Sequence, residues 1–151
     1  MNATQEGHVN EVGVTDSSPK KWMPDANPCA GGVNHTILVV EDEMLFRLDL
    51  AHQIRRAGFN VIEADSGDGA LIILEAERDV DLILTDIRMP GEIDGAGLAR
   101  SVRRQTQNIK IVVLSAYIDT QHELPVDAAF AKPVRMEALL AKVRELLPSQ
   151  T

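Results

Sequence analysis

The sequence predicts a doubly wound α/β domain, in which helices cover both faces of a five-stranded parallel sheet. Two observations support this prediction. Strand-like apolar runs alternate with helix-like segments from Thr36 onward, and strands that alternate with helices form parallel sheets through right-handed crossovers. The runs are also continuously apolar, which indicates strands buried on both faces of the sheet.

The candidate strands are short runs in which Ile, Leu, Val and Ala predominate. Such runs, bounded by polar residues, are typical of strands in the middle of a sheet. We expect strands at Thr36–Glu41, Asn60–Ala64, Asp81–Asp86, Lys110–Leu114 and Ala128–Ala131. Ligands of open α/β sheets bind at the carboxyl ends of the strands. The residues at those ends are therefore the candidate functional residues.

The first two candidate helices are predicted from apolar residues at helical spacing. One helix is expected over Glu43–Ala57 and stops at Gly58. Its apolar positions are Met44, Leu48, Ala51 and Ile54. Ser66 can cap a second helix that runs to Ala76. The inward-facing residues of this second helix are expected to be Ala70, Leu71 and Leu74.

Two further helices complete the pattern. We expect one at Ala96–Gln105 and one at Arg135–Leu147, the latter ending before Pro148 because proline cannot continue a helix. The interval Ala116–Ala131 is short for a loop, a helix, another loop and a strand. A helix there is expected to have barely two turns, within Asp119–Glu123, or to be missing, and the segment is expected to be more mobile than the core.

Composition divides the chain into three parts. Residues 1–34 are rich in Asn, Gly, Ser, Asp and Pro without a sustained period, which predicts a disordered extension. Residues 35–148 form the predicted domain, and 149–151 a tail, so no output domain is expected. In the extension, Trp22 and Met23 beside Lys20 and Lys21 are either a short docking element or exposed residues without a role.

Charge and cysteine content narrow the function classes. The formal net charge of -8 argues against broad binding to nucleic acid or anionic membranes, which favours basic patches. Cys29 is the only cysteine, so an internal disulfide and a cysteine-based zinc site are not expected. The chain shows no signal-peptide pattern and no apolar stretch long enough to cross a bilayer. The cytoplasm is the expected location.

Carboxylates gather at the carboxyl ends of two predicted strands. Asp86 ends one strand, and the sequence Glu41-Asp42-Glu43 follows another. Several like charges in one small space are unfavourable unless a cation or a proton offsets them. These carboxylates offer the oxygen ligands that Mg2+ binds, and Asp86 is also a candidate nucleophile, since aspartyl phosphates are known intermediates. Helix-terminal acids are the alternative for Glu41 and Asp42, and the expected role of Glu43.

Ser115 and Lys132 fall at the ends of the next two predicted strands. A phosphoryl group arriving at Asp86 needs its oxygens neutralised, and a hydroxyl and an ammonium group can both do this. Capping a short helix is the alternative role for Ser115, and a solvated surface position is the alternative for Lys132. The histidines have no metal-like spacing and are not expected to take part.

Four motifs together resemble the receiver domain of two-component response regulators, over about Thr36 to Leu147. The motifs are Ile37-Leu38-Val39-Val40-Glu41-Asp42-Glu43, Asp86-Ile87-Arg88-Met89-Pro90-Gly91 with Asp94-Gly95, Ser115-Ala116 and Lys132-Pro133. Each motif alone is weak, but their order and their positions at strand ends form a specific signal. The resemblance implies a flavodoxin-like receiver fold.

The resemblance also implies a role for each matching residue. Asp86 looks like the phosphoacceptor, which receives a phosphoryl group from a histidine kinase or a histidine phosphotransfer protein. Asp42 resembles the direct Mg2+ ligand, Glu41 acts on the metal through water, and the backbone carbonyl of Arg88 completes the protein ligands.

Two more roles follow from the same resemblance. Ser115 matches the hydroxyl that binds the phosphoryl group, and Lys132 matches the lysine that pairs with a phosphoryl oxygen. Such domains are usually signalling switches rather than enzymes, so we expect a stand-alone receiver that acts through protein binding or phosphorelay.

Three features depart from the family pattern. The position three residues before Lys132, usually aromatic, is Ala129, and Phe130 lies one step later on the opposite face of the predicted strand. The interval before it is short, so the output face is expected to be unusual. Arg88 and Tyr117 follow the phosphoacceptor and hydroxyl positions by two residues, and we expect them to tune the lifetime of the phosphoryl group.

Two alternative functions stay open at this stage. A pseudo-receiver, which acts as a constitutive interaction module, is compatible with the absence of an aromatic residue at Ala129. A haloacid-dehalogenase-like phosphatase uses a similar sheet, but that family has an Asp-x-Asp pair after its first strand. Here Glu41-Asp42-Glu43 is followed by Met44.

Overall fold

One sheet of parallel strands forms the centre of the molecule. The computed structural model describes residues 34–77, 79–116 and 123–149. Within these ranges the sheet has five strands in the order β2-β1-β3-β4-β5, all parallel. In chain order they are β1 (Thr36–Val40), β2 (Asn60–Ala64), β3 (Val80–Asp86), β4 (Lys110–Ser115) and β5 (Ala128–Ala131).

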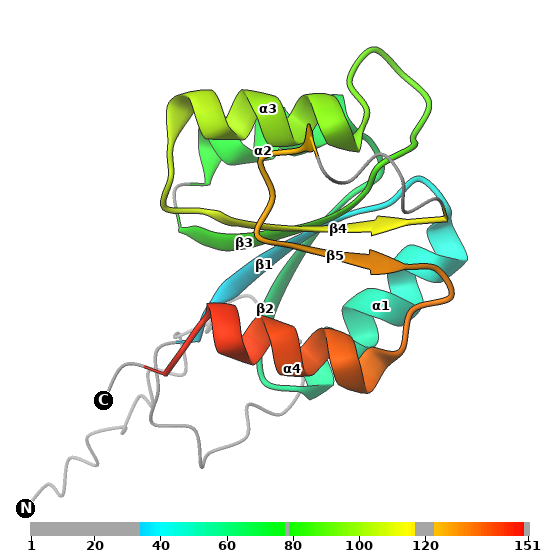
Figure 1. Cartoon of the computed structure of the whole chain (residues 1–151), viewed down its shortest axis with the longest axis vertical. Helices are drawn as coiled ribbons and strands as arrows, with labels where there is room; N and C mark the ends of the chain where they lie inside the picture. Colours follow the sequence, from blue (N-terminus) through cyan, green and yellow to red (C-terminus); the bar gives the residue numbers. More distant parts are fainter. Residues whose placement is uncertain (1–33, 78, 117–122, 150–151) are drawn as a thin grey trace, which may run out of the picture.

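Helices cover both faces of this sheet. Helices α2 and α3 lie on one face, and α1 and α4 lie on the other (Figure 1). Their bounds are α1 (Met44–Arg56), α2 (Gly67–Ala76), α3 (Gly95–Gln105) and α4 (Met136–Leu146). Every predicted strand and helix within the described ranges is present, with bounds that differ by one residue or none at either end. The predicted doubly wound fold class is confirmed.

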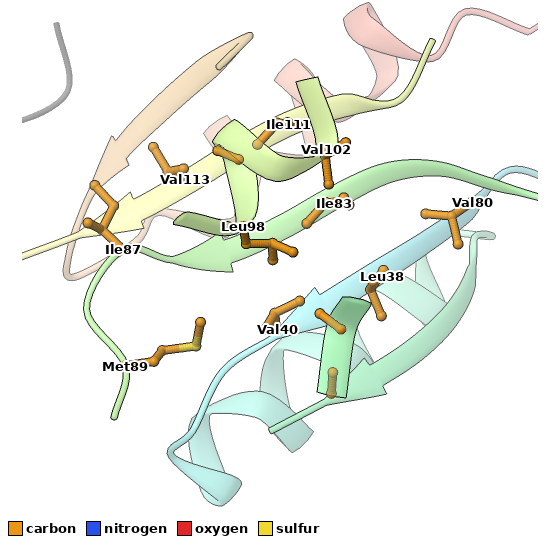
Figure 2. Packing of buried hydrophobic residues seen from close by; sticks show 13 residues of the cluster. Leu38, Val40, Val80, Ile83, Ile87, Met89, Leu98, Val102, Ile111 and Val113 are labelled. Atoms are coloured by element: carbon orange, nitrogen blue, oxygen red, sulfur yellow. The ribbon is translucent and has the colours of Figure 1, made fainter. Parts of the chain in front are cut away.

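The strands are continuously apolar because each face of the sheet has its own core. Leu38 and Val40 of β1 belong to the cluster under α2 and α3, whereas Ile37 and Val39 belong to the cluster under α1 and α4. Successive side chains of a strand point to opposite faces, so both faces require apolar residues. Figure 2 shows the first cluster, in which Leu98 and Val102 of α3 lie against the strands.

The buried side of α1 includes only part of the apolar positions that indicated this helix. Met44 and Leu48 have the expected helical spacing but are 58% and 47% exposed. The buried residues of α1 are Leu50, Ala51 and Ile54. Leu50 and Ile54 lie one helical turn apart and define the buried stripe, which leaves Leu48 on its flank. Met44 lies in the first turn, at the helix end.

Helices α2 and α3 both begin at polar caps. The hydroxyl of Ser66 accepts a hydrogen bond from the Gly69 amide at 3.1 Å, which confirms the predicted cap of α2. The carboxylate of Asp94 accepts one from the Gly97 amide at 2.8 Å and caps α3 in the same way. Such caps satisfy amide groups that have no partner inside the helix.

Several predictions concern residues outside the described ranges. These are the extension up to residue 33, Tyr117, and nearly all of the expected short helix at Asp119–Glu123. Residues 116 and 123–127, the described parts of the β4–β5 connection, contain no α-helix. Among the helices of the described ranges, none has the length and apolar character needed to cross a membrane.

Candidate functional site

The acidic cluster lies at the carboxyl edge of the sheet. Asp86 is the last residue of β3, and Glu41 directly follows its neighbour β1. The register pairs Val40 with Thr85, so the ends of β1 and β3 lie side by side at this edge. One carboxylate oxygen each from Glu41, Asp42 and Asp86 lies within 4.8 Å of the other two. The parallel strand order thus produces the carboxylate cluster that the sequence predicted.

Lys132 bridges two members of this cluster. Its Nζ lies 2.7 Å from Asp86 Oδ2 and 3.1 Å from Glu41 Oε2. The backbone of Lys132 is positioned by β4, because its amide donates to the Ser115 carbonyl at 2.8 Å, one step beyond the last pair of the β4–β5 ladder. Residues from three strand ends therefore meet at Asp86.

Burial and charge act in opposite directions on these groups. Glu41 is only 2% exposed. Burial raises the pKa of its carboxyl group, although hydrogen bonds from the Glu43 amide and from Lys132 oppose the shift. Burial alone would lower the pKa of Lys132, but its hydrogen bonds to Asp86 and Glu41 outweigh that effect and raise the pKa. Lys132 is therefore held in its charged form beside the carboxylates.

Ser115 and Arg88 lie at the same edge. Ser115 is the last residue of β4 and is buried. The register pairs Leu114 with Asp86, so Ser115 lies one residue beyond Asp86 on the adjacent strand. The backbone amide of Arg88 donates to Asp86 Oδ1 at 3.2 Å, and the Arg88 residue is exposed. Each residue that the sequence predicted for the site is thus placed at this edge.

The backbone around Asp86 is tightly packed. A Cβ atom at Gly95 would lie 1.8 Å from the Asp86 carbonyl oxygen, so only glycine fits at the start of α3. The Gly95 amide donates to the Ile87 carbonyl at 2.9 Å. The Thr85 hydroxyl donates to the Asp86 carbonyl at 2.8 Å. These contacts hold the backbone that presents the Asp86 carboxylate.

Two site neighbours on α1 were not predicted from the sequence. The Phe46 ring centroid lies 4.7 Å from Lys132 Nζ, within the range of a cation–π contact. Arg47 donates from its guanidinium to the Glu41 carbonyl at 2.8 Å. No motif marks either residue. Their position in the first turns of a helix that directly follows the acidic strand end is the signal that could have found them.

The structure also locates the unusual residues of β5. Ala129 packs with the cluster under α2 and α3, whereas Phe130 packs with the cluster under α1 and α4. The prediction that the aromatic side chain points to the opposite face is confirmed. The face that carries Ala129 therefore has a methyl group at this position of the strand.

The donor set fits a divalent cation. Three carboxylates from two adjacent strand ends supply hard oxygen ligands within 4.8 Å of one another, and Mg2+ binds one or two carboxylates together with waters and carbonyls. Lys132 is the one ammonium group bonded to the cluster among the described residues. The three carboxylates together exceed its single positive charge. A bound cation would relieve the remaining repulsion.

Comparison with known proteins gives a consistent result. Residues 37–144 match the family model of the response regulator receiver domain. The chain is 36% identical over 140 residues to the sensor kinase CckA of Brucella abortus, and the match covers 89% of this chain and 14% of that protein. It is 31% identical over 121 residues to sporulation initiation phosphotransferase F of Bacillus subtilis, covering 77% of this chain and 96% of that protein.

Solved structures resemble the chain equally well. The response regulator TrrA from Thermotoga maritima, in complex with Mg2+ and BeF, has a TM-score of 0.69 at 31% identity, with 74% of this chain and 98% of that one covered. The receiver domain of the hybrid histidine kinase CckA has a TM-score of 0.64 at 34% identity, with the same coverage.

Some relatives are much longer than the matched region. The chain spans only 31% of a cyclic di-GMP phosphodiesterase of Thermotoga maritima, to which it is 32% identical over 117 residues. Because the family model matches residues 37–144 and a relative that is 31% identical matches over 96% of its own length, the protein belongs to the response regulator receiver domain family.

Proposed function

We propose that the protein accepts a phosphoryl group on Asp86, in a Mg2+-dependent reaction, from a histidine kinase or a histidine phosphotransfer protein. One observation carries the proposal. Carboxylate oxygens of Asp86, Glu41 and Asp42 lie within 4.8 Å of one another, and the ammonium of Lys132 lies 2.7 Å from Asp86 Oδ2. A carboxylate between a cation-binding cluster and a fixed ammonium suits attack on a phosphorus atom whose oxygens need neutralisation.

The proposed step is a transfer between two protein side chains. A carboxylate oxygen of Asp86 attacks the phosphorus of a phosphohistidine, the P–N bond breaks, and the released imidazole takes up a proton. Mg2+ bound by Asp42, Asp86 and the Arg88 carbonyl, with Glu41 acting through water, would supply charge neutralisation on one side. Lys132 and the Ser115 hydroxyl contact the remaining phosphoryl oxygens.

We propose that the output is protein binding or phosphorelay rather than catalysis on a separate substrate. The net charge of -8 argues against nucleic acid and anionic membranes as partners and is compatible with a cytoplasmic protein. A stand-alone role is supported by the relative from Bacillus subtilis, because the match covers 96% of that protein.

A pseudo-receiver remains the second candidate. The observation that favours it is Ala129, whose small side chain occupies the face where the family usually has an aromatic group. The presence of Asp42, Asp86, Ser115 and Lys132 favours a receiver that is phosphorylated instead. A phosphatase of the haloacid-dehalogenase type is less favoured because the chain lacks its Asp-x-Asp pair.

Acetyl phosphate with Mg2+ distinguishes these functions. We expect an acid-stable, base-labile adduct of one phosphoryl group on the intact protein, measured by mass spectrometry. Asp86→Asn should abolish the adduct, whereas Asp81→Asn, at the other end of the same strand, should keep it. No adduct under conditions that label an authentic receiver would favour the pseudo-receiver. Turnover of unrelated phosphate esters would favour the phosphatase.

A further inference from the structure

A groove lies at the edge of the sheet opposite Asp86. It is bounded by the amino ends of β1, β2 and β3 and by the last turns of α2 and α3, and its volume is about 890 Å3. Val80 and Val102, two of its lining residues, are labelled in Figure 2. Val80 begins the strand that Asp86 ends, so the whole length of β3 separates the groove from the acidic cluster.

The groove combines an apolar floor with an acidic rim. Its apolar lining residues are Leu71, Leu74, Val80, Val102 and Ile109. Its acidic lining residues are Glu75, Glu77, Asp79 and Asp81. Among the described residues that line it, none is Lys or Arg. This chemistry suits a ligand with an apolar side chain flanked by positive charges.

The acidic residues of the groove differ in their hydrogen bonds and ion pairs with the rest of the chain. The Asp81 carboxylate accepts a hydrogen bond from the Thr36 amide at 2.8 Å and lies 3.3 Å from His35 Nδ1. Glu75, Glu77 and Asp79 are exposed on the rim. Glu75, Glu77 and Asp79 therefore present carboxylates to the solvent, whereas Asp81 fixes the start of β1. Arg78, between Glu77 and Asp79 in the sequence, lies outside the described residues.

The chain itself contains a segment with the complementary chemistry. Lys20, Lys21, Trp22 and Met23 follow one another, and Trp22 is the only tryptophan of the protein. Asn34, where the described part of the chain begins, lines the groove. Trp22 precedes Asn34 by 12 residues, and 12 residues of fully extended chain span about 40 Å. The segment is thus tethered at the mouth of the groove.

We propose that Lys20–Met23 docks in this groove of the same chain, with the Trp22 side chain on the apolar floor and the two lysines facing Glu75 and Glu77. Exposed ion pairs contribute little to affinity, so the aromatic contact supplies most of the binding and the charges select this groove. Tethering raises the effective concentration of the segment to the millimolar range, which allows a weak contact to be populated.

A second apolar surface of the described chain fits the segment less well. Met44, Leu45 and Leu48 are exposed on α1. They lie in the first turns of a helix that starts beside the acidic cluster, at the opposite edge of the sheet from Asn34. The groove is concave and adjacent to the tether, so it is the favoured position.

Fluorescence of the intact protein tests the proposal, because Trp22 is the only tryptophan. We expect its emission to be blue-shifted relative to the protein in denaturant and protected from acrylamide. The double variant Glu75→Lys and Glu77→Lys should move the emission to the red and raise the quenching constant about two-fold or more. The matched control, Glu137→Lys with Glu145→Lys, reverses two exposed charges on α4, which covers the opposite face of the sheet, and should change neither quantity. Circular dichroism verifies that both proteins are folded.

Four results would overturn the proposal. The first is a wild-type emission already at the position of the denatured protein. The second is an emission unchanged by the groove variant. The third is a red shift in Leu45→Ser instead, which would place the segment on α1. The fourth is an emission that shifts with protein concentration, which would indicate docking between two copies. None of these results depends on phosphorylation, so the test is separate from the proposed function.

Discussion

Asp86 and Ala129 lie on two strands of the same sheet, but their surroundings restrict the two side chains to different degrees. Around Asp86, the Thr85 hydroxyl, Gly95 and the Arg88 amide all contact its backbone or carboxylate. Ala129 is half-buried and contributes one methyl group to the cluster under α2 and α3. Several specific contacts thus hold Asp86, whereas Ala129 takes part through its packing alone.

We expect changes around Asp86 and changes at Ala129 to affect different properties. Asp86, the proposed phosphoacceptor, depends on several contacts from adjacent elements, so a change in any of them should disturb the proposed chemistry. On β5, the strand period fixes which cluster the side chain at position 129 faces. Four substitutions test this contrast, beginning with the largest expected effect.

Gly95→Ala should disrupt the acidic edge most strongly. The new Cβ would lie 1.8 Å from the Asp86 carbonyl oxygen, so the start of α3 must move. Overpacking of this kind destabilises proteins by about 1–3 kcal/mol, and we expect the upper end together with a strong loss of adduct formation. Urea unfolding and the acetyl phosphate assay measure both effects.

Gly97→Ala is the matched control for this change. The nearest atoms to a Cβ at Gly97 are side-chain atoms at 3.4 Å, which is ordinary contact or slightly closer. Since alanine favours helices over glycine by about 1 kcal/mol, Gly97→Ala should be neutral or stabilising. Equal destabilisation by both substitutions would show that the Asp86 backbone is not the constraint.

Lys132→Ala should slow adduct formation without preventing folding. The substitution removes the ammonium 2.7 Å from Asp86, and loss of one preorganised charge at a reacting centre slows catalysis by about a hundred-fold or more. Lys142→Ala is the control, because Lys142 pairs with Glu145 on exposed α4. A rate within a factor of about two of the wild type would contradict the role of Lys132.

Ala129→Tyr should change transmission rather than chemistry. The added ring would lie on the face under α2 and α3, which lacks an aromatic group on β5. We expect adduct formation to be nearly unchanged, whereas hydrogen exchange of residues 123–131 responds more strongly to phosphorylation than in the wild type. Ala128→Tyr adds the same ring to the opposite face and is the control. The same response in both variants would contradict the face-specific role of this position.

The sequence was sufficient for the fold because hydrophobic pattern and strand period determine it directly. Strand ends such as Asp86 and Lys132 could be placed at one edge because parallel strands all end on the same side. The rotation of α1 could not be predicted, since apolar spacing alone does not choose between Leu48 and Leu50 as the buried position. That choice depends on packing against the sheet, which is a tertiary effect.

The site was predicted where residues carry recognisable chemistry and missed where they act through packing. Carboxylates, a serine and a lysine at strand ends have few alternative explanations when they converge. Phe46 looks like any apolar residue of an amphipathic helix. Its contact with Lys132 arises only because α1 and the end of β5 lie on the same side of the acidic cluster, which no local pattern reveals.

Phe46→Leu should slow adduct formation less than Gly95→Ala or Lys132→Ala. The Phe46 ring lies 4.7 Å from Lys132 Nζ and helps to hold the ammonium toward Asp86. Cation–π contacts at partly exposed sites contribute about 0.5–1 kcal/mol, so adduct formation should slow by about two- to five-fold. Phe59→Leu is the matched control, because Phe59 packs against the same core cluster at the far edge of the sheet. If both variants slow the reaction equally, Phe46 acts through general packing rather than through Lys132.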